Sequence, residues 1–321
     1  MVKLVNTPDT EKVPGKVLSL CLPTYNRGWC IKEQIARLMT CSNTILDKME
    51  IIISDNCSDD DTKDIVNDAI AAGFRCRYIR NETNLGMDGN FVSCFQKATG
   101  KYVWLLGDDD LILIHQLEKI VNLLDGETEY GLIHIYMKDG MSDPIEYITD
   151  VEEMTRKVSY WITFISSNIV NTKYVPQIDF SKYMGTWFTL MPLYITALQK
   201  EKVNIIYNER VFEVAKDFSR NGGYNYFEVF VQNYLSIWKE MLINIPNAKK
   251  IFSYLKKDVY QGHIYIFLCK LYFSRNNGYY SKEHGWSLLL QYYGKEWYFW
   301  KSLIQYPFLK IKRKLSKALT L

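Results

Sequence analysis

Three consecutive carboxylates, Asp108, Asp109 and Asp110, end a short apolar run in the sequence YVWLLGDDD. Like charges this close repel one another, so they are stable where water solvates them or where a divalent cation neutralises them. A solvated turn before a helix near Ile114 is one interpretation, because Asp is common in turns and at helix starts. A cation site that serves a bound ligand is the other interpretation.

Two earlier apolar runs also stop at polar residues. The first, at residues 17–22, is predicted to form a strand that ends at Pro23, because proline has no N–H to donate to a sheet. The second, at residues 49–53, precedes a polar segment in which Ser58 or Asp59 is placed to cap a helix. Chemically useful side chains therefore follow several predicted strands.

The elements that must position these side chains alternate along the chain. Residues 62–72 and 91–98 have helical spacing, and short apolar runs at 76–80 and 132–136 read as further strands. Such alternation predicts an α/β fold with a mostly parallel sheet and helices on both faces. In such sheets ligands bind beyond the carboxyl ends of the strands, where all of these polar segments lie.

Several nucleotide-binding and phosphate-binding classes lack their defining element in this chain. No glycine-rich fingerprint follows the first strand, and no phosphate loop with Lys-Ser/Thr is present. A haloacid-type phosphatase would carry its aspartate nucleophile after the first strand, where this chain has Pro-Thr-Tyr-Asn. What remains is a nucleotide-diphosphate binder whose late aspartates hold a divalent metal.

Four segments carry a resemblance to a known family: LSLCLPTYNR, MEIIISDNCSDDDT, RNETNLGMDGN and ATGKYVWLLGDDDLI. In this order the chain resembles the inverting glycosyltransferases of family 2, which have the GT-A fold. It is similar in particular to bacterial members that build capsule, O-antigen, teichoic-type or related surface glycans, including the abequosyltransferase-like group. The resemblance covers about residues 16–135.

The resemblance implies a set of site residues and a cofactor. Asp55 matches the residue that reads the nucleotide base, Asp110 matches the metal ligand, and Gly107 replaces the first aspartate of the family's motif. The implied cofactor is Mn²⁺ or Mg²⁺, which suits oxygen ligands and offsets charge on the departing diphosphate. The implied nucleotide-sugar-binding residues are Pro23, Thr24, Tyr25, Asn26, Arg27, Asp55, Asn84, Gly86, Asn90, Asp108 and Asp109.

Inverting transfer also needs a general base that takes a proton from the acceptor hydroxyl. In much of the family this base is an acid near an acidic pair that opens a helix in the second half. The corresponding stretch here, residues 180–189, contains no acid. The nearest base candidates are Asp179 and Asp217, and either can also be an ordinary helix cap or turn residue.

The chain is predicted to have an extension at 1–15, a GT-A domain at 16–220 and a helical module at 221–321. Within the GT-A domain, the nucleotide-sugar half is about 16–135 and the acceptor half about 136–220. The uncharged segment 183–199 has 17 residues, fewer than the roughly 20 that cross a bilayer. We interpret it as part of a buried acceptor site lined by Trp187 and Phe188, although aromatic residues are also common in cores.

Composition predicts an enzyme of the cytoplasm. The 7 cysteines are scattered without a Cys-x-x-Cys pair, which is typical of reduced thiols. The first 16 residues are polar, so no secretory signal is expected. The 4 histidines are not at metal-ligand spacing, and His134 is expected to be a satisfied residue of the core or sheet.

The end of the chain is strongly basic. Six of the 39 basic residues follow Glu296, the last acid, so the other 33 are outnumbered by 36 acidic residues. Beyond Pro307, apolar residues at helical spacing alternate with these cations, which is typical of a helix on an anionic membrane surface. A solvated helix packed on the domain is the alternative, and nucleic-acid binding fits less well because no recognition motif is present.

We therefore expect a metal-dependent glycosyltransferase at the inner face of the plasma membrane. It would transfer a sugar from a nucleotide-diphosphate donor, with UDP favoured, to a lipid-linked or growing surface glycan. One alternative is a nucleotidyltransferase that activates a sugar phosphate. The other is a catalytically silent, membrane-peripheral partner in a glycan assembly complex.

Overall fold

The computed structural model describes residues 15–136, 143–214, 223–273 and 280–306 of the 321-residue chain. The chain divides into two compact units, Met1–Ser219 and Arg220–Leu321. The N-terminal unit is built on a large sheet, and the described part of the C-terminal unit is helical. The candidate site residues that the structure describes all lie in the N-terminal unit.

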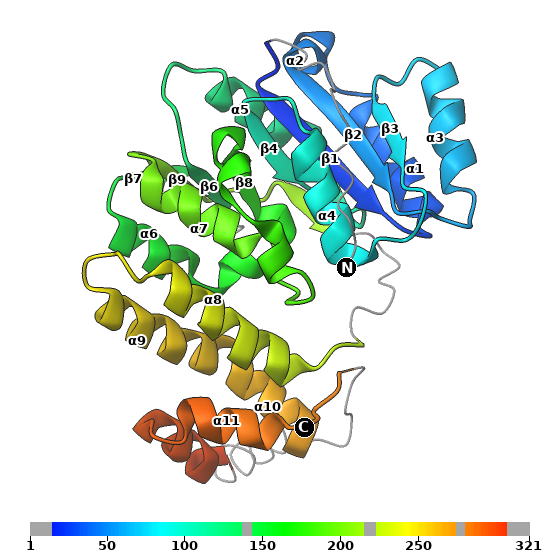
Figure 1. Ribbon diagram of the computed structural model, residues 1–321. Helices are drawn as coiled ribbons and strands as arrows, with labels where there is room; N and C mark the ends of the chain where they lie inside the picture. The colour runs from blue at the N-terminus through cyan, green and yellow to red at the C-terminus, as the bar shows by residue number, and fades with distance from the viewer. Residues whose placement is uncertain (1–14, 137–142, 215–222, 274–279, 307–321) are drawn as a thin grey trace, which may run out of the picture. The chain divides into compact units, whose positions relative to one another are not determined.

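The N-terminal unit contains an eight-stranded sheet with the order β3-β2-β1-β4-β8-β6-β9-β7 (Figure 1). Strands β3, β2, β1 and β4 are mutually parallel, and β8 runs antiparallel between β4 and β6. The mixed α/β architecture with a mostly parallel sheet confirms the predicted fold class. The strands are β1 (Leu18–Thr24), β2 (Met49–Asp55), β3 (Arg77–Arg80), β4 (Tyr102–Leu105), β6 (Leu132–Ile135), β7 (Ile145–Ile148), β8 (Asn168–Asn171) and β9 (Asn204–Tyr207).

A second, two-stranded sheet pairs β5 (Asp110–Ile112) with β10 (Phe212–Val214) in antiparallel fashion. Val214 lies opposite Asp110 in this pair. Because β5 begins at the last of the three aspartates, the backbone of Asp110 is fixed by strand pairing. The carboxylate is therefore presented from ordered backbone and not from a free loop.

Helices cover both faces of the large sheet. Leu18, Leu20 and Leu22 alternate along β1 and belong to a core with Ile31 of α1 and Leu117 of α5. On the other face, α4 and α7 lie over the sheet (Figure 1), where the Cys21 Sγ lies 3.8 Å from the carbonyl oxygen of Cys94. The helices of this unit are α1 (Gly28–Leu38), α2 (Asn43–Lys48), α3 (Thr62–Ala71), α4 (Gly86–Lys97), α5 (Ile114–Leu124), α6 (Val151–Val158) and α7 (Met191–Lys200).

The first strand is longer than predicted, because β1 continues through Pro23 to Thr24. In parallel pairing, successive residues bond alternately to the two neighbouring strands. The carbonyl of Thr24 accepts from Asn56 beyond β2, whereas the carbonyl of Cys21 accepts from Leu106 beyond β4. Pro23 therefore faces the side on which β4 has already ended, and its missing N–H costs no ladder bond.

Two local predictions in this half also need correction. Neither Ser58 nor Asp59 caps α3, which begins at Thr62, whose N–H donates to the Oδ1 of Asp60. The helix expected from residue 91 begins at Gly86, so Asn90 lies within α4. Gly86 has a φ of 72°, in the left-handed region that favours glycine, which lets the chain turn sharply into this helix.

Between α6 and α7 the chain forms short 3-10 turns on either side of β8. They are η1 (Ser159–Thr163), η2 (Ile165–Ser167), η3 (Thr172–Gln177) and η4 (Phe180–Tyr183). Short turns of this kind connect elements without covering the sheet. They place the segment before β8 beside the end of β4, because these two strands pair.

The C-terminal unit has an aromatic core. Tyr226 stacks on Phe230 and Phe267, and Tyr260 packs against Tyr293. Two helical regions of this unit each contain a π-helical segment. The elements are η5 (Glu228–Asn233), α8 (Tyr234–Met241), α9 (Ala248–Val259), η6 (Tyr260–Ile264), α10 (Tyr265–Phe273) and α11 (Gly285–Tyr293), with η5 and η6 the π-helical segments.

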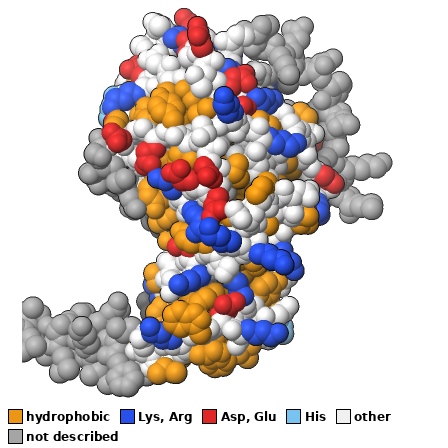
Figure 2. Space-filling model, turned by 90° about the vertical axis from the view of Figure 1, so that its left-hand side faces the viewer, with side chains coloured by type: hydrophobic (Ala, Val, Ile, Leu, Met, Phe, Trp, Pro, Cys, Tyr) orange, Lys and Arg blue, Asp and Glu red, His pale blue; other side chains and the backbone are white. Residues whose placement is uncertain are grey.

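The surface of the C-terminal unit carries large apolar side chains beside cations. Figure 2 shows hydrophobic side chains next to lysines on one face of this unit. The ammonium groups of Lys257 and Lys301 both lie over the ring of Trp297. No helix among the described residues is long and apolar enough to span a membrane. The predicted basic tail lies in 307–321, outside the described residues.

Candidate active site

The ends of β1 and β4 are joined by hydrogen bonds to one buried carboxylate. The hydroxyl of Thr24 donates to Oδ2 of Asp108 over 2.8 Å, and Nη1 of Arg27 donates to Oδ1 over the same distance. Arg27 also lies 3.2 Å from Oδ2 of Asp109. Four of the predicted binding residues are thus brought together at the carboxyl edge of the sheet.

Asp108 has both carboxylate oxygens engaged inside the protein. Its side chain is buried, and burial raises its pKa, while Arg27 and the Thr24 hydroxyl oppose that rise. A carboxylate with this set of partners is an anchor for the loop that follows β1. Gly107, which stands where the family has an aspartate, directly precedes Asp108 in the chain.

The next two carboxylates converge above Gly107. A Cβ atom on Gly107 would lie 3.1 Å from Oδ2 of Asp110 and 3.2 Å from Oδ1 of Asp109. The hydroxyl of Ser166 donates to Oδ2 of Asp110 over 2.5 Å and accepts from the N–H of Gly107 over 2.9 Å. Any side chain at position 107 would crowd both carboxylates, which gives a physical reason for glycine here.

These carboxylates fit a hard divalent cation. Burial, together with the charges of Asp109 and Asp108, raises the pKa of Asp110 to about 7, while the Ser166 hydroxyl and Arg27 oppose this rise. No group of three or more His, Cys, Asp or Glu side chains in the described ranges is arranged to hold a metal ion by itself. One or two carboxylates are nevertheless the usual protein share where phosphates supply the remaining ligands.

The predicted base-reading residue, Asp55, is at the end of β2 and fully buried. Its Oδ1 accepts from the N–H of Ser58, and its Oδ2 accepts from the hydroxyl of Tyr78 over 2.6 Å. The Nε of Arg80 lies 3.4 Å from the same oxygen. Asp55 is thus held from the third strand, and Tyr25 lies exposed after β1.

Asparagines connect the loops after β2 and β3. Asn56 donates to Oδ1 of Asn84 over 2.8 Å and to the carbonyl of Gly86 over 3.1 Å. Asn90 is buried and exchanges hydrogen bonds with the side chain and carbonyl of Ser54. Asn84 and Gly86 are therefore exposed on the loop, whereas Asn90 anchors α4 to β2. Asn26 has a φ of 53° and accepts from the N–H of Asp59 over 2.7 Å.

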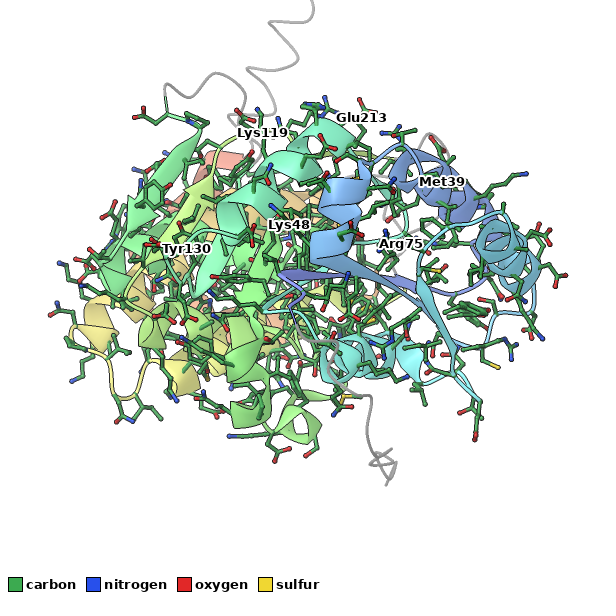
Figure 3. The ribbon with its side chains drawn as sticks, turned by 90° about the horizontal axis from the view of Figure 1, so that it is seen from above. Met39, Lys48, Arg75, Lys119, Tyr130 and Glu213 are labelled. Carbon is green, nitrogen blue, oxygen red and sulfur yellow. The ribbon has the colours of Figure 1, made fainter. Side chains whose placement is uncertain are left out.

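The described acids nearest to the acceptor stretch in the sequence each have partners of their own. Asp179 accepts from the N–H and hydroxyl of Ser181, so it caps the short turn η4. Glu213 and Glu209 are paired with Arg37 and Lys119, and Figure 3 shows Lys119 and Glu213 projecting from the upper edge of the unit in that view. Asp217 lies outside the described residues.

Sequence reasoning missed two residues at this edge, Ser166 and Asp88. Ser166 lies in an uncharged segment with no motif, 56 positions from the carboxylate that it contacts. Asp88 lies inside the NETNLGMDGN segment, in which only Asn84, Gly86 and Asn90 are predicted to bind the nucleotide sugar. Its Oδ2 accepts from the N–H of Gly185 over 2.7 Å, 97 positions away. Only the folded chain reveals either pairing.

Comparison with known proteins identifies the family. A model of glycosyl transferase family 2 matches residues 19–190, more than half of the chain. The chain belongs to glycosyl transferase family 2. The predicted family is confirmed, and the matched range includes every predicted nucleotide-sugar-binding and metal-binding residue.

Two curated relatives of this family 2 chain are similar over little more than a third of its length. Abequosyltransferase RfbV of Salmonella typhimurium is 34% identical over 117 residues, which cover 36% of this chain and 35% of the relative. GalNAc(5)-diNAcBac-PP-undecaprenol beta-1,3-glucosyltransferase of Campylobacter jejuni is 30% identical over 120 residues, covering 37% of each protein. The match thus spans about a third of the length of these relatives.

Solved structures share the fold of the family 2 chain at low sequence identity. S. aureus TarS 1–349 in complex with UDP has a TM-score of 0.58 at 18% identity, covering 76% of this chain and 72% of that one. Mannosyltransferase PcManGT of Pyrobaculum calidifontis, in complex with GDP-Man and Mn²⁺, has a TM-score of 0.50 at 12% identity, covering 92% and 88%. Both likenesses establish the fold.

Proposed function

We propose that this chain is a metal-dependent inverting glycosyltransferase that uses a nucleotide-diphosphate sugar. The observation that carries the proposal is the convergence of Asp109 and Asp110 above Gly107, beside the loops that follow β1, β2 and β3. The carboxyl edge of a parallel sheet is where such a ligand binds. Family membership supplies the reaction class.

In this proposal Asp110, with Asp109 beside it, holds Mn²⁺ or Mg²⁺ on the donor diphosphate. The cation would act as a Lewis acid that offsets the charge of the leaving group. Arg27 and Thr24 fix Asp108, which keeps the loop after β1 against the donor side. Ser166 orients Asp110 through its hydroxyl, leaving the other carboxylate oxygen free of this contact.

For the nucleotide, the proposed contacts come from the loops after the first three strands. Tyr25 is exposed and can cover a base, while Asp55 is held at the end of β2 by Tyr78 and Arg80. Exposed Asn84 and Gly86 lie on the loop that passes near the donor. A UDP-sugar is favoured, since TarS was solved with UDP, and GDP is the next nucleotide to test, since PcManGT was solved with GDP-Man.

The proposed acceptor is a lipid-linked or growing surface glycan. One similar protein is named for a glucosyl transfer to a glycan on PP-undecaprenol, and another for abequosyl transfer. The apolar and cationic surface of the C-terminal unit is consistent with a place on the inner face of the plasma membrane. The domain limits 16–220 and 221–321 and the base candidates Asp179 and Asp217 remain predictions.

A second candidate is a catalytically silent partner in a glycan assembly complex. The absence of an acid from residues 180–189 favours it, because this stretch is where the base is expected. A nucleotidyltransferase is less well supported, since no glycine-rich basic loop follows β1. Detection of sugar transfer would exclude the silent partner, and detection of pyrophosphate release would favour the nucleotidyltransferase.

The proposal can be tested by thermal unfolding with UDP, GDP, CDP and dTDP, with and without MnCl₂. A nucleotide at about 100 times its Kd stabilises the folded state by about 2.7 kcal/mol. We expect one nucleotide to raise the melting temperature only when Mn²⁺ is present. The variant Asp110→Asn should lose this Mn²⁺-dependent shift, because an amide oxygen cannot replace a charged ligand.

Asp64→Asn is the matched control, because Asp64 is an exposed acid in the first turn of α3. It should keep the full nucleotide shift. An Asp110→Asn protein with an unchanged Mn²⁺-dependent shift would show that the metal assignment is wrong. A wild-type protein that no nucleotide stabilises would instead support the silent partner.

A further inference from the structure

Residues 180–189 contain no acid, but in the folded structure the carboxylate of Asp88 lies against this segment. Asp88 on α4 accepts a hydrogen bond at Oδ2 from the N–H of Gly185 over 2.7 Å and a second bond from the N–H of Trp187. Both donors lie within residues 180–189. A carboxylate from the donor half is therefore held against the segment in which the base is expected.

The segment that Asp88 holds has an unusual backbone. Gly185 and Trp187 have φ values of 80° and 69°, both in the left-handed region. This conformation is costly for a tryptophan, so surrounding contacts must impose it. The two bonds to one oxygen of Asp88 are such contacts, and they leave the indole of Trp187 exposed at the pocket mouth.

Asp88 faces a small pocket lined by Phe91, Ile165, Trp187 and Tyr194, among others. Ile165 directly precedes Ser166, the partner of Asp110, so one short segment contributes both to the pocket lining and to the proposed metal side. The acceptor hydroxyl of an inverting transfer must arrive next to the donor sugar. Asp88 is an acid that lines this pocket, as a base serving such a hydroxyl must.

Two polar atoms lining this pocket are buried and have no hydrogen-bond partner within the described residues. They are Oδ1 of Asp88 and the hydroxyl of Tyr194. The side chain of Asp88 is only 9% exposed and that of Tyr194 only 1%. An unpaired carboxylate oxygen and an unpaired phenol that is protonated form an acceptor and a donor. Each of the two groups can pair with a hydroxyl of a bound sugar.

We infer that Asp88 is the general base of the proposed glycosyl transfer and that Tyr194 orients the acceptor hydroxyl toward it. This inference rests on the proposed function. Oδ1 of Asp88 takes the proton of the acceptor hydroxyl while its oxygen forms the bond to the anomeric carbon. The bond from that carbon to the donor phosphate breaks, and its electron pair leaves with the nucleoside diphosphate.

The local chemistry supports this role. Burial raises the pKa of Asp88 above that of an ordinary carboxyl group, and the two backbone N–H groups only partly lower it. A stronger base is better matched to an alcohol proton at neutral pH. Burial also raises the pKa of Tyr194, which keeps its hydroxyl a donor. Asp179, in contrast, is exposed and already bonded to Ser181.

The test uses the full-length chain with Asp88→Asn and Asp88→Ala. Asparagine keeps an oxygen for the N–H groups of Gly185 and Trp187 but cannot accept a proton. Turnover is measured as release of nucleoside diphosphate from UDP-glucose, UDP-GlcNAc and GDP-mannose, with water or an undecaprenyl-diphosphate-linked sugar as acceptor. We expect both variants to lose turnover by about 10²- to 10⁴-fold. The Mn²⁺-dependent thermal shift with nucleotide should persist in Asp88→Asn.

A merely structural role predicts a different result. Asp88→Asn would then retain near wild-type turnover and only Asp88→Ala would fall, which would overturn the inference. Loss of turnover in Asp179→Asn with normal turnover in Asp88→Asn would also overturn it. Asp64→Asn is the control and should match the wild type.

The pH dependence of the wild-type rate gives a second test, made over the pH range in which thermal unfolding shows that the protein remains folded. The rate should fall on the acidic side at a pH above the ordinary Asp value of about 3.9, as Asp88 becomes protonated. A flat acidic profile in a turning-over enzyme would contradict the inference. Absence of all nucleotide binding and turnover in the wild type would instead refute the proposed function on which it rests.

Discussion

At the scale of single residues, Arg27 decides whether the carboxylates at the end of β4 can stay together. Its guanidinium contacts both Asp108 and Asp109, and its side chain is 25% exposed while that of Asp108 is 7% exposed. Removing one partner of a buried pair leaves a charge without compensation, which costs far more than the pair contributes. Arg27 is therefore required for the fold of this edge as well as for its charge.

We expect Arg27→Ala to lower the free energy of unfolding by about 2 kcal/mol, because Asp108 keeps Thr24 but loses its cation. Urea unfolding at neutral pH measures this change. Arg75→Ala is the control, because Arg75 and Asp47 form a pair in which both side chains are at least half exposed. That variant should lose less than about 1 kcal/mol. Equal losses in the two variants would contradict the role given to Arg27.

At the scale of elements, β8 links the two halves of the large sheet through a buried histidine. His134 on β6 shares a 2.9 Å hydrogen bond with Oδ1 of Asn168 at the start of β8. Burial lowers the pKa of His134 to about 4, with the Asn168 bond opposing this change. His134 was predicted to be a satisfied residue of the core or sheet; it is buried in the sheet, but its Nε2 lacks a partner among the described residues.

This pKa predicts how the stability of the N-terminal unit changes with pH. Between pH 6.5 and about 4 the unfolded chain binds a proton at His134 that the folded chain does not. Stability therefore falls as the pH falls through this window, by about 3 kcal/mol in all from this group. His134→Asn should flatten the pH dependence of urea unfolding between pH 7 and 4.5.

The control for this experiment is His284→Asn, because the ring of His284 is 77% exposed. Its pH dependence should match that of the wild type. If His134→Asn keeps the wild-type slope of unfolding free energy against pH, then other groups dominate acid sensitivity and His134 is protonated in the folded state.

The sequence predicts those features of the fold that depend on local periodicity and on the residues at strand ends. The order of strands and helices to β4 follows from alternating apolar runs, and the parallel order then brings Thr24 near Asp108. Contacts between distant segments leave no such trace. The bonds of Asp88 to Gly185 and of Ser166 to Asp110 depend on β8 pairing with β4, and no local pattern encodes that pairing. Pro23 was misjudged because its effect depends on which neighbouring strand it faces.

At the scale of the whole molecule, charge is distributed unevenly along the chain. The net charge is +3, yet the 33 basic residues that precede residue 301 are outnumbered by 36 acids. The excess positive charge is therefore confined to the end of the chain. Cations near an anionic lipid surface contribute about 1 kcal/mol each, so a short segment of this kind can determine where a protein resides.

We expect the full-length protein to sediment with vesicles that contain phosphatidylglycerol and to be released by high salt. Replacing Lys310, Lys312, Arg313 and Lys314 with Gln should weaken this binding by at least about a hundredfold. A control variant replaces four exposed cations of the N-terminal unit with Gln: Lys32, Lys63, Arg75 and Lys119. Equal binding by both variants, or binding to purely zwitterionic vesicles, would contradict an electrostatic membrane contact at the end of the chain.

The hydrogen bond from Ser166 to Asp110 determines where this protein can be cut and rejoined with a relative. Asp110 belongs to the half that contains the family's motifs, whereas Ser166 and β8 come from the half that would be exchanged to alter the acceptor. A chimera joined near residue 135 would separate the carboxylate from its hydroxyl and β4 from its neighbour. A junction beyond residue 190, where the family match ends, transfers both partners together. Recombination between relatives should therefore tolerate the later junction far better than the earlier one.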